Sequence, residues 1–233
     1  MLENKRKGVY LLPNLITTAA LFSGFYSIVL SINGETLPAV FAIIIAMALD
    51  GLDGRIARLT NTQTDFGAYY DSLSDMICFG LAPALLIYIW GLSHFNIFGW
   101  HWSKIAWISC FIYVGSTAIR LARYNSKNQT QDKKYFTGLA SPAAAAVLIC
   151  YAWLIEDSGI SIENISFITL FLLIILSLLM TSNITYYSFK DINIRHKVPH
   201  VTLFLIVIAL SFISFDPPKV LLSFFSIYAL SGP

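Results

Sequence analysis

The chain has 233 residues, of which 57% are apolar and only 12% are charged, and its formal net charge is +2. Soluble domains carry about twice that charged fraction, so the composition excludes one, and no basic patch points to nucleic-acid binding. We therefore expect an all-α, polytopic integral membrane protein that forms a single domain over residues 1–233.

Apolar runs recur along the whole sequence. Since a spanning helix needs about 20 residues, we predict eight helices, at 11–32, 37–57, 68–91, 105–124, 141–155, 164–187, 199–215 and 219–230. Eight buried helices of a soluble core would need far more polar surface than this chain offers. Lys5 to Lys7 before an apolar run would also suit a signal peptide, but the run is too long for one, so we expect a retained first helix.

The basic residues predict an orientation. With the amino terminus inside, Lys104 and Lys219 fall on the outer side and all other Lys and Arg residues fall on the cytoplasmic side. This cytoplasmic set is Lys5, Arg6, Lys7, Arg55, Arg58, Arg120, Arg123, Lys127, Lys133, Lys134, Lys190, Arg195 and Lys197. The sequence thus predicts a protein of the cytoplasmic membrane with both termini, and the site described next, facing the cytoplasm.

The first predicted helix begins with the run Leu12-Pro13-Asn14-Leu15-Ile16-Thr17. Proline suits the first turn of a helix. Local capping accounts for the polar side chains of Asn14 and Thr17, which commonly bond to backbone groups at a helix start.

The most informative stretch runs from Asp50 to Asp75 and reads DGLDGRIARLTNTQTDFGAYYDSLSD. Its carboxylates lie at the ends of two long apolar segments, where an isolated acidic residue costs roughly 2.5 to 3.5 kcal/mol at mid-bilayer. Helical spacing gathers them on two faces. The first face carries Asp50, Asp53, Gly54, Ala57 and Arg58, and the second carries Gly67, Asp71 and Asp75.

Two acidic faces opposite each other would repel unless divalent cations lay between them. Ligands that offer only oxygen favour Mg²⁺ or Mn²⁺ over zinc. The alternative is an ion or proton transporter that uses the carboxylates as its path. We find no second acidic set and no repeated half that would build an outer gate, which disfavours a transporter.

Two connecting segments separate these helices from their neighbours. Residues 59–66 form a short polar link, and Asp65 at its end is predicted to cap the third helix. Residues 92–103 are expected to form an aromatic loop on the outer side. His94 and His101 in that loop could suggest a metal, but belt residues at the membrane interface are the better interpretation.

A second polar stretch follows the fourth predicted helix. Arg120 and Arg123 are three residues apart on one helix face. They are either ordinary cytoplasmic anchors or forks that hold a phosphate or carboxylate. The fifth helix then opens with small residues from Ser141 to Ala146, which permit close packing.

Taken together, these motifs resemble a known family. The pattern D-x-x-D-G-x-x-A-R followed by G-x-x-x-D-x-x-x-D matches the signature of the CDP-alcohol phosphatidyltransferases without a departure. The run from Arg120 to Asn125 and the run from Gly138 to Ala145 are similar to those of its phosphatidylserine synthase branch. The resemblance covers roughly residues 8–150 and implies that the eight predicted helices include the family's six-helix core.

The resemblance also implies roles for single residues. The metal ligands would be Asp50, Asp53 and Asp71, with Asp75 completing the cluster and acting as general base. The contacts to CDP-diacylglycerol would be Asn14, Gly54, Ala57, Arg58, Thr64 and Gly67. The serine carboxylate or a phosphate would be held by Arg120, Arg123 and Ser141.

The implied reaction transfers the phosphatidyl group of CDP-diacylglycerol to the hydroxyl of L-serine and releases CMP, with two Mg²⁺ or Mn²⁺ ions. The acidic signature fixes the donor and leaves the acceptor open, so relatives that use choline or glycerol phosphate remain alternatives. The implied partners are the two substrates, membrane lipid and a second copy of the chain in a homodimer. Nucleic acid is not expected.

Overall fold

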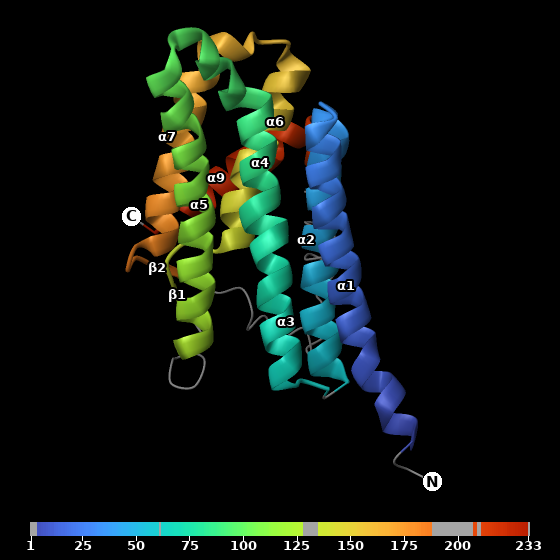
Figure 1. The fold of residues 1–233 in the computed structure, drawn as a ribbon. Coiled ribbons are helices and arrows are strands. Elements are labelled where there is room, and N and C mark those ends of the chain that lie inside the picture. Colours follow the sequence, from blue (N-terminus) through green and yellow to red (C-terminus); the bar gives the residue numbers. More distant parts are fainter. Residues whose placement is uncertain (1–3, 61, 128–134, 188–206, 209–210, 233) are drawn as a thin grey trace.

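The computed structural model describes residues 4–60, 62–127, 135–187, 207–208 and 211–232, and helices dominate them (Figure 1). Four helical segments of this part of the chain are long and apolar enough to cross a membrane. They are Leu11–Ile32, Thr36–Leu59, Asp65–Phe98 and Trp100–Ser126. The prediction of an all-α, membrane-embedded protein is therefore confirmed.

The predicted helices up to residue 181 all occur, and their bounds differ modestly from the expected ones. They are α1 (Asn4–Ile32), α2 (Thr36–Leu59), a composite third segment, α5 (Trp100–Lys127), α6 (Ser141–Ser158) and α7 (Ile162–Thr181). Near the end of the chain, α9 (Pro217–Leu230) matches the last predicted helix and runs obliquely across the back of the bundle (Figure 1). The predicted helix at 199–215 lies largely outside the described residues.

The third segment changes its winding several times. It consists of α3 (Asp65–Asp75), the π-helix η1 (Met76–Leu81), α4 (Ala82–Ile87), the π-helix η2 (Tyr88–Leu92) and the 3₁₀-helix η3 (Ser93–Phe98). Wide π turns disturb the regular backbone ladder, and here side chains from neighbouring helices bond to the disturbed turns. The Tyr113 hydroxyl donates to the Phe79 carbonyl at 3.0 Å, and the Ser166 hydroxyl donates to the Gly91 carbonyl at 3.1 Å.

The predicted loop at 92–103 is wrong, because most of it is helical. It contains η3 and the start of α5, with Gly99 between them at a φ of 104°. The aromatic rings of this segment pack on α7: Phe95 and Trp102 both meet Phe167 edge to face, at centroid distances of 5.1 and 5.2 Å. This packing orders a segment whose aromatic composition alone suggested an interfacial loop.

A small β-ribbon was not predicted. The predicted helix at 164–187 ends early, at Thr181, and β2 (Thr185–Tyr187) pairs antiparallel with β1 (Tyr135–Thr137). The segment after β1 is tied to the same region, since Gly138 N–H donates to Ile184 O at 2.7 Å and Leu139 N–H donates to Leu179 O at 3.0 Å. The ribbon therefore joins the start of α6 to the end of α7.

Small residues hold the helices close together around α6. Its alanines from Ala143 to Ala146 are all buried, and α6 contacts α2, α4, α7 and α9. On the other side of the bundle, buried α1 hydroxyls donate to carbonyls of α2: Ser23 to Ala42 at 2.7 Å and Ser27 to Ala39 at 2.9 Å. In a membrane, close approach and such interhelical hydrogen bonds replace the hydrophobic effect as the source of helix association.

A close helix crossing involves Gly24 of α1. A Cβ atom at Gly24 would lie 2.6 Å from Cys78 Sγ and 3.0 Å from Cys78 Cα in η1. Only a residue without a side chain fits there. This crossing keeps α1 against the segment that follows Asp75.

We predict that Gly24→Ala lowers the midpoint of thermal unfolding of the purified protein by several degrees. Overpacking costs about 1–3 kcal/mol, whereas better helix propensity returns only about 1 kcal/mol. Gly115→Ala in α5 is the matched control, because nothing lies within 4 Å of a Cβ built at Gly115. Equal unfolding midpoints for the two variants would contradict the close crossing.

Candidate active site

A cavity of about 640 Å³ opens at the end of the bundle where α2 passes into α3. Its walls come from the first half of α1, the end of α2, α3, the end of α5 and the start of α6. Most of the residues singled out in the sequence line it: Asn14, Asp50, Asp53, Gly54, Ala57, Arg58, Thr64, Gly67, Asp71, Asp75 and Arg120. Asn14 and Arg120, which are 106 positions apart in the sequence, thus line the same cavity.

Three of the four predicted acidic residues form a tight cluster. One carboxylate oxygen each of Asp50, Asp53 and Asp71 lie within 4.8 Å of one another. Asp50 and Asp53 come from α2 and Asp71 comes from α3, so the two predicted acidic faces lie opposite each other at this point. Three oxygens at this spacing suit a hard divalent cation, which prefers carboxylate ligands.

Asp75 lies beside this cluster rather than in it. Its carboxyl is within hydrogen-bonding reach of Asp50 and interacts electrostatically with Asp71 and Arg120. It ends α3 immediately before the π-helix η1, so it lies deeper in the bundle than Asp71. This position separates Asp75 from the three residues best placed as ligands.

Asp53 is held by a residue of α1. The Thr17 hydroxyl lies 2.6 Å from Asp53 Oδ2 and 3.1 Å from the Pro13 carbonyl. Both side chains are buried, with exposed fractions of 4% for Thr17 and 5% for Asp53. A hydroxyl bonded to a carboxylate in such surroundings fixes its orientation. The sequence analysis missed this role, although Thr17 lies three residues after Asn14 and so shares its helix face.

The side chains of Asn14 and Thr64 both lie close to Gly67, the first residue of the second predicted acidic face. The Thr64 hydroxyl caps α3 by accepting from Gly67 N–H at 3.0 Å. A Cβ at Gly67 would come within 3.1 Å of Thr64 Oγ1 and 3.4 Å of Asn14 Oδ1. Gly67 therefore lets α1 approach the start of α3, and Thr64 rather than Asp65 is the N-cap.

Gly54 and Arg58 form the open wall of the cavity. Nothing lies within 4 Å of a Cβ built at Gly54, which leaves room for a ligand to approach the backbone. Arg58, one turn further along α2, is exposed and donates from Nε to Gly54 O at 2.9 Å. That bond uses one of the five N–H donors of the guanidinium and orients the rest of the fork.

The two arginines of α5 have different surroundings. Arg120 lines the cavity and donates from Nη1 to Ser141 Oγ at 2.6 Å, whereas the buried Ser141 itself does not line it. Arg123 does not line the cavity. It donates to the carbonyls of Thr181 at 2.6 Å and Ser182 at 2.9 Å, at the end of α7. Arg123 thus satisfies free carbonyls at a helix C-terminus.

Two further lining residues had no assigned role in the sequence analysis. Asn125 of α5 donates from Nδ2 to the Ser72 hydroxyl of α3 at 3.0 Å, and both line the cavity. Asn125 belongs to the run that begins at Arg120, and Ser72 follows Asp71 directly. Their bond ties the helix that carries Asp71 to the helix that carries Arg120.

The structure explains why the run from Gly138 to Ala145 begins with glycine. Its φ of 83° lies in the left-handed region that side chains disfavour. A Cβ there would also collide with the Met180 carbonyl oxygen. Glycine at this position lets the chain pass close to the end of α7 just before α6 begins, where Ser141 accepts a hydrogen bond from Arg120.

Comparison with known proteins agrees with this geometry. The sequence model described as CDP-alcohol phosphatidyltransferase matches residues 10–179. A relative from Helicobacter pylori named CDP-diacylglycerol--serine O-phosphatidyltransferase is 36% identical over 225 residues, which cover 96% of this chain and 90% of the relative.

Relatives with the same name occur in other domains of life. One from Methanocaldococcus jannaschii is 38% identical over 149 residues, 64% of this chain and 63% of the relative. One from Saccharomyces cerevisiae is 34% identical over 170 residues, 67% of this chain and 58% of the relative. Since the family model spans most of the sequence and its full acidic signature lines one cavity, this chain belongs to the CDP-alcohol phosphatidyltransferase family.

Proposed function

We propose that this protein is a phosphatidylserine synthase, which transfers the phosphatidyl group of CDP-diacylglycerol to the hydroxyl of L-serine and releases CMP. The observation that carries the proposal is the cluster of Asp50, Asp53 and Asp71 in a cavity at the end of membrane-spanning helices. The name shared by the relatives from bacteria, an archaeon and yeast supports serine as the acceptor.

The cluster would hold Mg²⁺ or Mn²⁺ through Asp50, Asp53 and Asp71, and the family resemblance implies two such ions. When bound, such ions clamp a pyrophosphate and stabilise the entering and leaving oxygens of a phosphoryl transfer. On the chain's own side, the Thr17 hydroxyl holds the Asp53 carboxylate, and α1, which packs on both α2 and α3, keeps the two acidic helices together before the substrate arrives.

The donor would bind along α2 and the adjoining ends of α1 and α3. Gly54 and Ala57 leave space for the cytidine and its ribose, and the Arg58 fork would pair with the pyrophosphate. Asn14, Thr64 and Gly67 form the opposite rim, where the Asn14 amide can bond to the nucleotide. The acyl chains would stay in the bilayer between the helices.

The acceptor would bind deeper, between Asp75 and Arg120. Asp75 would take the proton of the serine hydroxyl as its oxygen forms a bond to phosphorus, while the bond from phosphorus to the CMP oxygen breaks. Arg120, oriented by Ser141, would hold the serine carboxylate. We leave Arg123 out of the acceptor site because its donors serve the α7 carbonyls.

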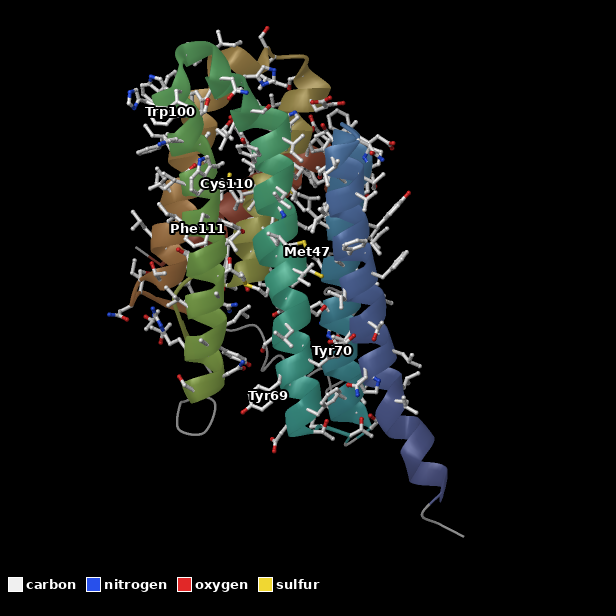
Figure 2. The ribbon with its side chains drawn as sticks, in the orientation of Figure 1. Met47, Tyr69, Tyr70, Trp100, Cys110 and Phe111 are labelled. Carbon is white, nitrogen blue, oxygen red and sulfur yellow. The ribbon has the colours of Figure 1, made fainter. Side chains whose placement is uncertain are left out.

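We also propose that the cavity faces the cytoplasm, in a cytoplasmic membrane with both termini inside. Arg55, Arg58, Arg120 and Arg123 lie near the cavity end, whereas Lys104 lies at the other. Aromatic residues occupy both ends, as at membrane interfaces: Tyr69 and Tyr70 lie near the cavity, and Trp100 lies at the opposite end (Figure 2). The homodimer and the single catalytic domain over residues 1–233 rest on the family resemblance and the sequence alone.

The acceptor is tested by incubating the purified protein with CDP-diacylglycerol, Mn²⁺ and one acceptor at a time. We expect L-serine to stimulate CMP release and to yield phosphatidylserine, while choline and glycerol phosphate give only the background rate. The variant Asp71→Asn, which removes a cluster charge, serves as the inactive control. Stimulation by choline or glycerol phosphate in place of serine would reassign the acceptor, and CMP release in none of the reactions would remove the enzyme assignment.

Asp75→Asn should lower the turnover number by about 10²- to 10⁴-fold, the usual contribution of a general base. Because Asp75 stands outside the carboxylate cluster, binding of Mn²⁺ and of CDP-diacylglycerol should persist. Titration of both ligands on the purified variant, beside single-turnover kinetics, separates the two effects. A variant that has lost metal binding outright would make Asp75 a ligand instead of the base.

The two arginines of α5 should respond differently to substitution. Arg120→Gln removes a charged donor to the serine carboxylate, worth about 1.5–3 kcal/mol, and should raise the KM for serine at least ~10-fold. Arg123→Gln should leave that KM unchanged and lower the unfolding midpoint, because it uncaps α7. Arg55→Gln, at an exposed position of α2, is the control for loss of a charge near this face. A serine KM raised equally in both α5 variants would return Arg123 to the acceptor site.

A further inference from the structure

The α1 helix supplies no carboxylate to the site, yet it touches both helices that do. At Thr17 the side chain donates to Asp53 Oδ2 of α2 at 2.6 Å. The backbone carbonyl of the same residue accepts from the Ser74 hydroxyl of α3 at 3.4 Å. Ser74 directly precedes Asp75, so one residue of α1 contacts both acidic helices at the level of the cluster.

The surroundings make the contact between Thr17 and Asp53 specific. Both residues are almost fully buried, so water has little access to compete for the carboxylate oxygen. Asp53 also belongs to the group of three whose oxygens lie within 4.8 Å. The hydrogen bond at Oδ2 restricts rotation of the Asp53 carboxylate, and this restriction also fixes the position of the other oxygen, Oδ1.

Thr17 is itself fixed in its helix. A β-branched residue in a helix has few side-chain rotamers, and in the rotamer adopted here the single hydroxyl hydrogen is directed to the nearer acceptor, Asp53 Oδ2 at 2.6 Å, rather than to the Pro13 carbonyl at 3.1 Å. Less than one turn further along α1, Ala20 O accepts from the Cys78 thiol at 3.3 Å, which continues the contact of α1 with η1. The hydroxyl is thus part of a rigid support.

We infer that Thr17 is a positioning residue for the metal site: its hydroxyl fixes the Asp53 carboxylate in the orientation in which that carboxylate binds a divalent cation. The inference rests on the proposed function in that it takes Asp50, Asp53 and Asp71 as the ligands. It extends that function by giving α1 a part in metal affinity. Partners that orient ligands in this way typically contribute 10- to 100-fold to metal affinity.

The test measures Mn²⁺ binding to the full-length protein purified in lipid nanodiscs. Binding is detected as a decrease of the electron paramagnetic resonance signal of free Mn²⁺. Thr17→Val keeps the branched shape and removes the hydroxyl, so we expect Mn²⁺ affinity to fall by about 10- to 100-fold. Thr17→Ser keeps the hydroxyl and should bind Mn²⁺ within ~3-fold of the wild type, by the same reasoning.

Ser27→Ala is the matched control. It removes a hydroxyl bond of the same kind between α1 and α2, from Ser27 to Ala39 O at 2.9 Å, at a position that does not line the cavity. Its Mn²⁺ affinity should equal that of the wild type, even if its unfolding midpoint falls. A loss of Mn²⁺ affinity in the Ser27 variant equal to that in Thr17→Val would attribute the effect to helix packing and overturn the inference.

The remaining outcomes also decide. Wild-type affinity in Thr17→Val, or an equal loss in Thr17→Ser, overturns the role of the hydroxyl while leaving the metal site intact. A wild-type protein that binds no Mn²⁺ overturns the metal site and this inference together. If Thr17→Val does not fold, Thr17→Ala decides instead: a loss of affinity of more than ~10-fold supports the inference, and an unchanged affinity overturns it.

Discussion

Repulsion within the acidic cluster is the constraint on which the rest of the site depends. Two unit charges 4.8 Å apart repel by about 3.5 kcal/mol at an effective dielectric constant of about 20. Three such pairs exceed the roughly 2 kcal/mol that a hydrogen bond to a charged group contributes, so the Thr17 hydroxyl alone cannot offset them. The cluster must take up protons or cations. Under the proposed function, divalent cations would neutralise the carboxylates and would also supply the positive charge that stabilises a pyrophosphate.

A cluster under such repulsion stays together only on a rigid support. The close crossing at Gly24 holds α1 against η1, and serine hydroxyls join α1 to α2. The π turns of η1 widen the third segment immediately after Asp75, and Tyr113 bonds to a carbonyl of the wide turn. π-helices commonly occur at functional sites. Here the change of winding allows Asp75 to lie beside the cluster while the rest of the segment packs against α5 and α6.

The sequence predicted those features that depend on one helix at a time. Spacings of three and four residues placed Asp50 with Asp53 and Asp71 with Asp75 on single faces, and the apolar runs located the helices. Beyond the meeting of the two acidic faces, features that depend on which helices meet were not predictable. Arg120 and Arg123 share a face by spacing, but one meets α6 and the other meets the end of α7. Thr17 looked like a local cap because nothing in its own segment indicates Asp53, and strands of three residues are too short for an alternating pattern to emerge.

The parts of the cavity differ in how they are braced. The proposed metal and donor side is built from α1, α2 and α3, whose cavity-lining residues lie within the stretch that the family model matches. The proposed acceptor side depends on contacts beyond that stretch: Arg123 bonds to Thr181 and Ser182, and the ribbon pairs β1 with β2 shortly before Ser141. The Tyr186 hydroxyl in turn donates to Ala229 O of α9 at 2.9 Å, which anchors the ribbon to the last helix. The contacts that support Arg120 are therefore separate from those that hold the acidic cluster.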